Sequence, residues 1–370
     1  MEEKAVIMIK VSVVVPVYNA AAYLEECMNS LVQQTLREIE IICVNDGSTD
    51  HSLELLKKYQ KKDSRIKIIS KTNAGYGHTV NVGLETAAGK YIGIVEPDDF
   101  IRKTMYERLY QIAEKLDLDM VKADFYQFHG EKKKKKLEYR HLSKNKSLYG
   151  KVWNPKENTD VFLFLMNTWT GIYKREFLNK HHIRHHESEG ASFQDLGFWF
   201  QSFCFAKRVY LINEPFYMYR SDNPKSSVHS REKVSAICRE YEFMYSFLEQ
   251  HPKLKKRYIN IYSWKRFHDY QFALNRMGKE YRQEFVQRFR QDFIEAEKKG
   301  ELSDAYFHRG DWRMLHQMMN TPQKFLSLFW WNNSWYKVRY YKEQYGTKET
   351  VVKVMKKLFG ILPYGKKQGR

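Results

Sequence analysis

Short apolar runs alternate with segments of helical period between Val11 and Val95, and this alternation restricts the chain to an α/β fold. The first run, Val11–Val15, predicts a buried strand, and apolar side chains at helical spacing follow it at Leu24, Met28 and Leu31. The pattern repeats, with strands predicted at 39–44, 66–69 and 91–95 and helices at 53–59 and 80–87. A chain that alternates in this way builds βαβ units around an open sheet.

Polar or turn-forming clusters follow each of these four predicted strands. In open α/β sheets a ligand binds outside the carboxyl ends of the strands, so these clusters are the first candidates for a site. They are Pro16–Asn19, Asn45–Asp50, Lys71–Gly77 and Glu96–Asp99.

The acidic cluster Glu96–Asp99 carries the strongest chemical signal. It places three carboxylates directly after an apolar strand, and like charges that close together raise one another's pKa unless a cation neutralises them. A hard divalent cation, Mg²⁺ or Mn²⁺, that also binds phosphate oxygens is the usual solution. The alternative is structural, with Asp98 and Asp99 forming a turn after Pro97 or capping a helix predicted near Thr104.

Two further clusters suggest contacts to a nucleotide. Asp46, after the second strand, can accept the N3 proton of a uracil ring; the alternative is an Asp-Gly turn, with Thr49 and Asp50 capping the next helix. The glycines of Asn73–Gly83 let the backbone approach a nucleotide, or serve only the loop. This segment is not G-x-G-x-x-G and follows the third strand, which counts against a dinucleotide-binding dehydrogenase.

The later sequence offers a candidate general base and a candidate cation. Asp195 lies at the start of an aromatic helix predicted at 195–206, where an aromatic wall would raise its pKa and hold a sugar ring; the alternative is an N-cap. Arg220 lies in a cationic, turn-rich segment, Tyr219–Ser227, after a strand predicted at 209–212. Arg220 would neutralise the charge of a leaving diphosphate. The alternative is that the segment is an exposed linker to the C-terminal helices.

Composition narrows the function classes. The chain has 63 Lys+Arg against 44 Asp+Glu, a net charge of +19, which suits nucleic acid, an anionic membrane face or a phosphorylated substrate. The longest lysine run, Lys132–Lys136, contains no aromatic residue and is expected to be a solvated loop, so we do not expect nucleic-acid binding. The cysteines form no C-x-x-C pair and the histidines at 181–186 lack zinc-site spacing, so neither a zinc site nor a disulfide framework is expected.

The chain changes character near residue 230. Long, charged, aromatic-rich helical segments follow, which predicts an α/β catalytic domain at 1–230 and a helical region at 231–370. Val351–Leu362 carries a basic amphipathic pattern, either docked on the protein's own core or in contact with a membrane surface. No run of apolar residues predicts a signal peptide or a membrane span, and a reducing compartment fits the cysteines best.

Taken in order, these motifs resemble the motif series of family 2 glycosyltransferases of the bacterial surface-polysaccharide type. The segments that carry the resemblance are 11–19, 41–50, 73–83, 96–99 and 190–198, and it covers about residues 11–230. It implies the GT-A fold, an open mixed sheet with a Rossmann-like nucleotide-binding half, followed by the helical C-terminal region.

The resemblance also implies roles for individual residues. The donor would contact Pro16, Tyr18, Asn19, Asp46, Asn73, Gly75, Glu96 and Arg220. Asp98 would be the principal ligand of Mn²⁺ or Mg²⁺, Asp99 would bind the metal or, with Gln194, the acceptor, and Asp195 would be the catalytic base. Glu96 stands where Asp is commoner in the family, and Gln194 where many members have Glu.

The activity implied is a single in-line displacement with inversion, from a nucleotide sugar such as a UDP-sugar to a hydroxyl of a saccharide or lipid-linked acceptor. Net charge and the basic C-terminal pattern predict a cytoplasmic enzyme, peripheral at the inner face of the plasma membrane. The rival enzyme class, a sugar-1-phosphate nucleotidyltransferase, needs a glycine-rich basic loop after the first strand, where this chain has Pro16–Asn19.

Overall fold

The computed structural model describes residues 8–130, 136–164, 166–224, 236–327 and 329. Most of the lysine run at 132–136, the segment 225–227 and the amphipathic pattern at 351–362 lie outside the described residues. Contacts divide the chain into two compact units, Met1–Gly278 and Lys279–Arg370, and each is described by itself. Within the described ranges, no helix combines the length and the apolar character needed to cross a membrane.

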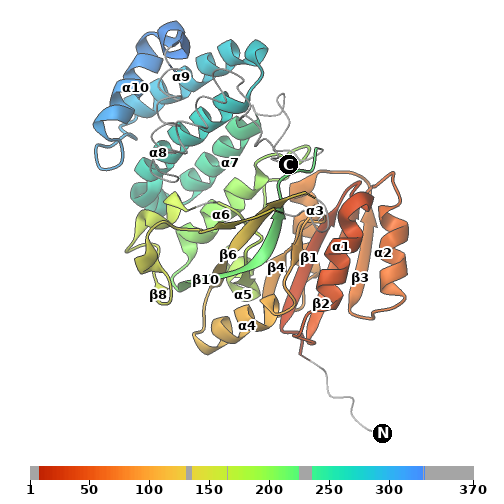
Figure 1. The fold of residues 1–370 in the computed structure, drawn as a ribbon. Helices are drawn as coiled ribbons and strands as arrows, with labels where there is room; N and C mark the ends of the chain where they lie inside the picture. The colour runs from red at the N-terminus through yellow and green to blue at the C-terminus, as the bar shows by residue number, and fades with distance from the viewer. Residues whose placement is uncertain (1–7, 131–135, 165, 225–235, 328, 330–370) are drawn as a thin grey trace, which may run out of the picture. The chain divides into compact units, whose positions relative to one another are not determined.

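A mixed β-sheet runs through the first unit (Figure 1). Its strands lie in the order β3-β2-β1-β4-β9-β6-β10-β5, with β7 paired to β6 and β8 to β10. They are β1 (Val11–Val17), β2 (Ile39–Asp46), β3 (Ile66–Lys71), β4 (Tyr91–Ile94), β5 (Phe100–Ile101), β6 (Met120–His129), β7 (Lys136–Arg140), β8 (Val152–Trp153), β9 (Gly171–Lys174) and β10 (Val209–Arg220). The predicted open mixed sheet is therefore confirmed.

Strand direction brings the predicted site clusters to one edge. β1 pairs in parallel with both β2 and β4, so Val14 lies beside Ile42 on one side and Ile94 on the other. β6 and β10 are also parallel, whereas β9 runs antiparallel to β4 and β6. The carboxyl ends of β1, β2 and β4 consequently meet at the same edge of the sheet.

Helices pack on this sheet and on one another. The helices of the first unit are α1 (Ala21–Val32), α2 (Ser52–Gln60), α3 (Tyr76–Thr86), α4 (Met105–Lys115), α5 (Arg175–Lys180), α6 (Gln194–Phe205), α7 (Ala236–Gln250) and α8 (Pro252–Arg276), with single 3₁₀ turns at η2 (Lys146–Leu148) and η3 (Thr159–Leu163). α3 packs on β1 and β2. Gly83 makes that approach close, because a Cβ there would lie 2.3 Å from Val14 Cγ1.

The change of character near residue 230 marks where the sheet ends and the helices begin, at Arg220 and Ala236. The compact unit extends further, to Gly278, because α7 packs on α6 and α8 packs on α7 and η3. The described part of the second unit contains η6 (Lys279–Tyr281), α9 (Arg282–Lys298) and α10 (Arg309–Asn320), and α9 packs against α10.

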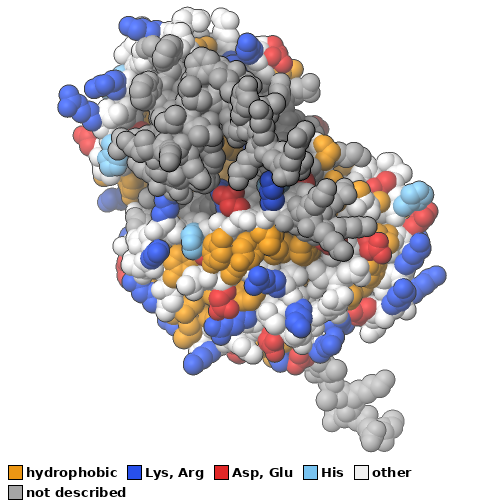
Figure 2. Space-filling model, viewed as in Figure 1, with side chains coloured by type: hydrophobic (Ala, Val, Ile, Leu, Met, Phe, Trp, Pro, Cys, Tyr) orange, Lys and Arg blue, Asp and Glu red, His pale blue; other side chains and the backbone are white. Residues whose placement is uncertain are grey.

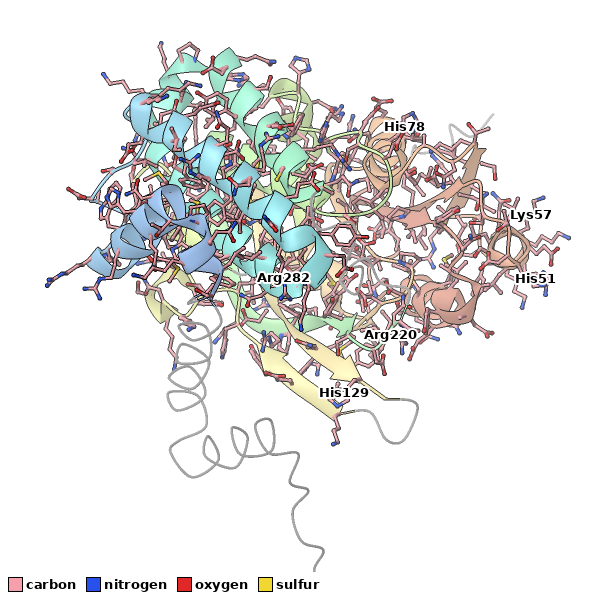
Figure 3. The ribbon with its side chains drawn as sticks, turned by 90° about the horizontal axis from the view of Figure 1, so that it is seen from above. His51, Lys57, His78, His129, Arg220 and Arg282 are labelled. Carbon is pink, nitrogen blue, oxygen red and sulfur yellow. The ribbon has the colours of Figure 1, made fainter. Side chains whose placement is uncertain are left out.

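Basic side chains are spread over the part of the described surface that Figure 2 shows. Where side chains are coloured in Figure 2, Lys and Arg alternate with Asp and Glu along the lower part of the visible face and do not gather in one patch. In Figure 3, Arg220 is labelled at the end of β10 and His78 on α3.

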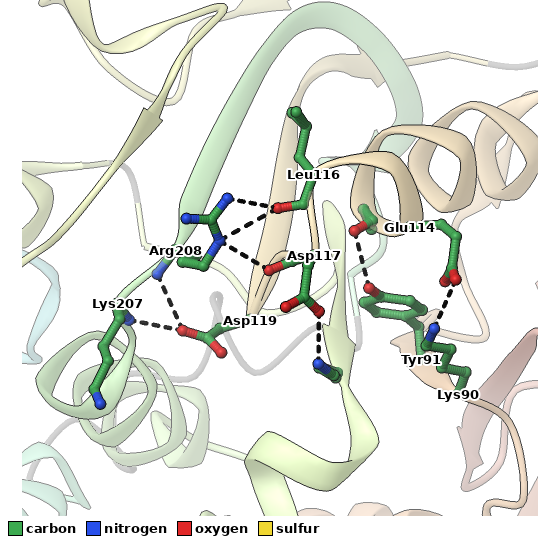
Figure 4. A network of polar contacts seen from close by, with 10 residues as sticks. Lys90, Tyr91, Glu114, Leu116, Asp117, Asp119, Lys207 and Arg208 are labelled. Atoms are coloured by element: carbon green, nitrogen blue, oxygen red, sulfur yellow. Dashed lines mark hydrogen bonds and ion pairs between the residues drawn. The ribbon is translucent and has the colours of Figure 1, made fainter.

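The edge of the sheet opposite the site is closed by polar contacts (Figure 4). Arg208 Nη2 donates to the Leu116 carbonyl at 2.8 Å and its Nε to that of Asp117 at 3.0 Å, beyond the carboxyl end of α4. Asp119 Oδ2 accepts the backbone N–H groups of Lys207 (2.7 Å) and Arg208 (3.0 Å). These contacts brace α4 against the start of β10.

Candidate active site

Asp99, in the acidic loop after β4, is held inside the protein. The residue is only 1% exposed. Its Oδ1 accepts a hydrogen bond from the Arg220 N–H at 2.6 Å, and its Oδ2 accepts one from the Tyr217 hydroxyl at 2.9 Å. Burial and the neighbouring Asp98 carboxylate raise the pKa of Asp99 well above its usual value. Both oxygens hydrogen-bond to β10, and the metal or acceptor contact predicted for this residue stays a prediction.

Glu96 and Asp98 are more open. The Tyr76 hydroxyl donates to Glu96 Oε1 at 2.7 Å, and Asn223 Nδ2 donates to Asp98 Oδ2 at 2.8 Å. Burial raises the pKa of Glu96 to about 8, with smaller contributions from the Asp98 and Asp195 carboxylates. In the described part of the chain, no lysine or arginine side chain pairs with the carboxylate of Glu96 or Asp98.

This pair of carboxylates fits a divalent cation shared with a substrate. No group of three His, Cys, Asp or Glu side chains converges among the described residues, so the protein alone does not build a closed metal site there. Mg²⁺ in phosphate-transfer sites uses one or two carboxylates and completes its shell with water and substrate phosphates. Glu96 and Asp98 supply oxygen ligands of this kind, and neither carboxylate is paired with a lysine or arginine side chain of the described residues.

Arg220 holds the acidic loop in place. Its guanidinium lies between the rings of Tyr23 (4.6 Å) and Phe128 (4.7 Å), and its Nη2 donates to Glu26 Oε2 at 2.6 Å. Its Nε donates to the Asp98 carbonyl at 2.9 Å, and the residue is only 7% exposed. These contacts hold the guanidinium within the protein, and the diphosphate contact predicted for Arg220 stays a prediction.

Asp46, at the end of β2, organises the neighbouring glycine loop. Its oxygens accept the N–H groups of Ala74 (2.9 Å) and Gly75 (3.1 Å), and it forms an ion pair with Lys71. Asn73 Nδ2 donates to the Asp46 carbonyl at 3.1 Å. The carboxylate predicted to bind uracil therefore also fixes the conformation of the loop at 73–75.

The residues after β1 divide between structure and exposure. Pro16 is buried within the strand, whereas Tyr18 is 53% exposed. Asn19 has a positive φ of 49°, and its Oδ1 accepts the N–H groups of Thr49 (2.8 Å) and Asp50 (3.3 Å). Of this predicted group, Tyr18 is the side chain most open to a ligand.

Asp195 lies in the first turn of α6. The helix starts after Phe193, whose φ is 68°, so Asp195 is not its N-cap. Burial, followed by the field of Glu240, raises the pKa of Asp195 to about 6, which suits a general base near neutral pH. The aromatic side chains of this helix, Phe198, Trp199 and Phe200, are buried in the core, so the sugar-binding wall predicted beside Asp195 stays a prediction.

The loop that leads to Asp195 abuts the glycine loop. Tyr76 N–H donates to the Gly190 carbonyl at 2.8 Å, and a Cβ at Gly75 would lie 2.9 Å from the Ser188 carbonyl oxygen. Gln194, predicted to meet the acceptor, is 2% exposed and donates to Ser188 Oγ at 3.0 Å. The carboxylates of Glu96 and Asp195 both act on the Tyr76 hydroxyl, whose pKa burial and these charges raise well above its usual value.

Sequence reasoning missed the tyrosines of the site. Tyr76 binds Glu96, Tyr217 binds Asp99 and accepts the Glu96 N–H at 3.0 Å, and Trp169 stacks on Tyr217 with ring centroids 4.2 Å apart. The strand predicted at 209–212 continues to 220, and that extension brings Tyr217 to the site. The Tyr-x-Tyr alternation at 217–219 was the one available signal for a longer strand.

Comparison with known proteins gives one consistent group. The family described as Glycosyl transferase family 2 matches residues 12–187. The chain is 34% identical over 219 residues to the uncharacterized glycosyltransferase EpsJ of Bacillus subtilis. This match covers 58% of this chain and 62% of that protein. It is 31% identical over 218 residues to glycosyltransferase GlyG of Streptococcus pneumoniae, which covers 57% of this chain and 70% of that protein.

A solved structure shares the fold. The S. aureus TarS 1–349 structure in complex with UDP-GlcNAc matches with a TM-score of 0.50 at 19% identity, over 73% of this chain and 82% of that one. This likeness confirms the predicted fold class. Since the chain matches 62% of the length of EpsJ, the likeness leaves more than a third of that relative unmatched.

Proposed function

Because the chain belongs to glycosyltransferase family 2, we propose that it transfers a sugar from a nucleotide-sugar donor, a UDP-sugar, to a hydroxyl of a saccharide or lipid-linked acceptor with inversion of configuration. One observation carries this proposal. Asp195, whose pKa burial raises to about 6, acts together with Glu96 on the Tyr76 hydroxyl, and no lysine or arginine side chain among the described residues pairs with Glu96 or Asp98.

Asp195 acts as the base. It removes the proton from the acceptor hydroxyl while that oxygen forms its bond to the anomeric carbon. The bond from that carbon to the diphosphate breaks in the same step, so the proton ends on Asp195 and the negative charge leaves with UDP. A single displacement with one base and no second nucleophilic carboxylate inverts the anomeric configuration.

Other residues bind and orient the donor. Asp98, with Glu96, would hold Mn²⁺ or Mg²⁺, which when bound would neutralise the diphosphate. Tyr18 and the loop at 73–75, which Asp46 holds, line the nucleotide position. Arg220 supports the acidic loop by donating to the Asp98 carbonyl, and Asp99 anchors the same loop to β10.

The experiment is a panel of UDP-sugars incubated with Mn²⁺ and read as released UDP. We expect one donor to stand out, and Asp98→Ala to reduce its turnover by about 100-fold or more, since metal stabilisation of leaving charge supplies several kcal/mol. Glu85→Ala, which removes an exposed carboxylate from α3, is the matched control and should retain wild-type turnover. Release of UDP that needs neither metal nor Asp98 would contradict the assignment.

A further inference from the structure

Helix α7 lies beyond the predicted catalytic region, yet it contacts the loop that carries the base. Its Glu240 is fully buried at 0% exposure. Glu240 Oε1 accepts a hydrogen bond from the Ser188 hydroxyl at 3.0 Å and forms a second contact with His186 Nδ1 at 2.9 Å. The His186 ring also stacks on Phe243 of the same helix, with ring centroids 4.6 Å apart. One carboxylate therefore holds two residues of the loop at once.

A second link continues from this loop to the start of α6. Ser188 Oγ accepts a hydrogen bond from Gln194 Nε2 at 3.0 Å, and Gln194 directly precedes Asp195. α6 and α7 approach closely at Gly197, where a Cβ would lie 2.8 Å from Phe243 Cδ1 and 3.7 Å from Glu240 Oε2. Glu240 thus lies beside the first turns of the helix that presents the base.

The second oxygen of Glu240, Oε2, is buried without a hydrogen bond among the described residues. A buried carboxylate oxygen without a partner costs free energy, so its presence calls for a functional reason. The charge of Glu240 contributes to the raised pKa of Asp195, after burial.

We propose that Glu240 is a positioning residue for the catalytic base, which makes α7 part of the catalytic apparatus. This inference rests on the proposed function, since it assigns Glu240 a role only if Asp195 is the base. It acts in two ways: its Oε1 anchors the loop at 186–194, and its charge opposes the charge of ionised Asp195. The groups that face Asp195 are Glu240 on α7, Lys265 on α8, Glu96 after β4, Tyr76 on α3, Tyr173 on β9 and Tyr219 on β10.

Two substitutions separate these effects. Glu240→Gln keeps an acceptor for Ser188 and removes the charge, so the acid limb of the pH profile of UDP release should move to lower pH by roughly half a unit to one unit. Glu240→Ala also removes the anchor and should lower kcat by about 10- to 100-fold, as loss of a supporting contact does, while KM for the UDP-sugar stays within about twofold. Glu242→Gln, the same charge change on an exposed position of α7, should shift neither quantity.

Ser188→Ala tests the anchor without changing a charge. It should lower kcat without moving the acid limb, and hydrogen exchange of the amides at 186–194 should accelerate in this variant and in Glu240→Ala. Wild-type enzyme that releases UDP normally, together with a folded Glu240→Gln variant whose acid limb does not move, would overturn this inference alone. A wild-type protein that releases UDP from no UDP-sugar would overturn the proposed function and this inference with it.

Discussion

Acidic residues of the same type meet different environments within this one site. Asp99 and Asp46 use their oxygens to hold protein backbone, whereas Asp195 stays part-buried with a pKa raised to about 6. The difference lies in what each carboxyl binds: Asp99 is buried and bonded through both oxygens to β10, Asp46 is bonded to the loop at 73–75, and Asp195 lies in the first turn of α6 beside the like charge of Glu240. Residue identity alone therefore predicts that carboxylates gather here and does not predict which of them is free to react.

The pH dependence follows from Asp195. The folded protein raises its pKa from 3.8 to about 6, so the carboxylate that acts as base is present above that pH and is lost as the pH falls through it. We expect the rate of UDP release from the preferred donor to decrease when the pH drops below about 6. Asp195→Asn should lose about 10³-fold or more in kcat and also lose this acid limb, while UDP affinity by calorimetry stays nearly unchanged.

A weakened affinity for UDP in Asp195→Asn, equal in size to the loss of turnover, would mean that Asp195 binds the donor and is not the base. Asp292→Asn, a carboxylate of α9 paired with Arg288, serves as a control in the second compact unit.

At the scale of elements, the central strands were predictable because burial on both faces makes them mostly apolar. β1, β2 and β4 fall where the apolar runs predict them, and α1, α3 and α6 follow from helical spacing. The extension of β10 past Ile212 was not predicted, because Asn213, Glu214 and Pro215 interrupt the apolar pattern and the register shifts there. The tyrosines and Glu240 were missed since their roles depend on contacts between segments far apart in the sequence.

The contact between α3 and the loop before α6 gives a prediction at this scale. A Cβ at Gly77 would lie 1.9 Å from the His186 carbonyl oxygen, so Gly77→Ala must push α3 and the loop apart. Overpacking against backbone costs about 1–3 kcal/mol, which should lower Tm by roughly 3–10 °C and reduce turnover through Asp195.

Gly310→Ala is the matched control for this change. It is also a helical glycine, on α10, and a Cβ there meets no atom within 4 Å, so calorimetry should show an unchanged or slightly higher Tm. A Gly77→Ala protein with wild-type Tm and turnover would show that the loop moves freely away from α3.

For the whole molecule, the charge of +19 gives a third kind of prediction. Each Lys or Arg near an anionic lipid surface adds about 1 kcal/mol, and salt screens this attraction over a Debye length of about 10 Å at 0.1 M. We propose that the protein works at such a surface on its acceptor, and we expect it to co-sediment with vesicles of roughly one-third anionic lipid at low salt. Vesicles of neutral lipid should not retain it, and failure to bind the anionic vesicles would remove the membrane part of the proposal.

β10 lies between β6 and β5, late in the sequence, and its Tyr217 and Arg220 hold Asp99 more than a hundred residues upstream. A nascent chain still attached to the ribosome can complete β1 to β4 early, but its acidic loop stays untethered until residue 220 has emerged. The acidic loop proposed to hold the metal therefore acquires its anchors only after more than half of the chain has been synthesised.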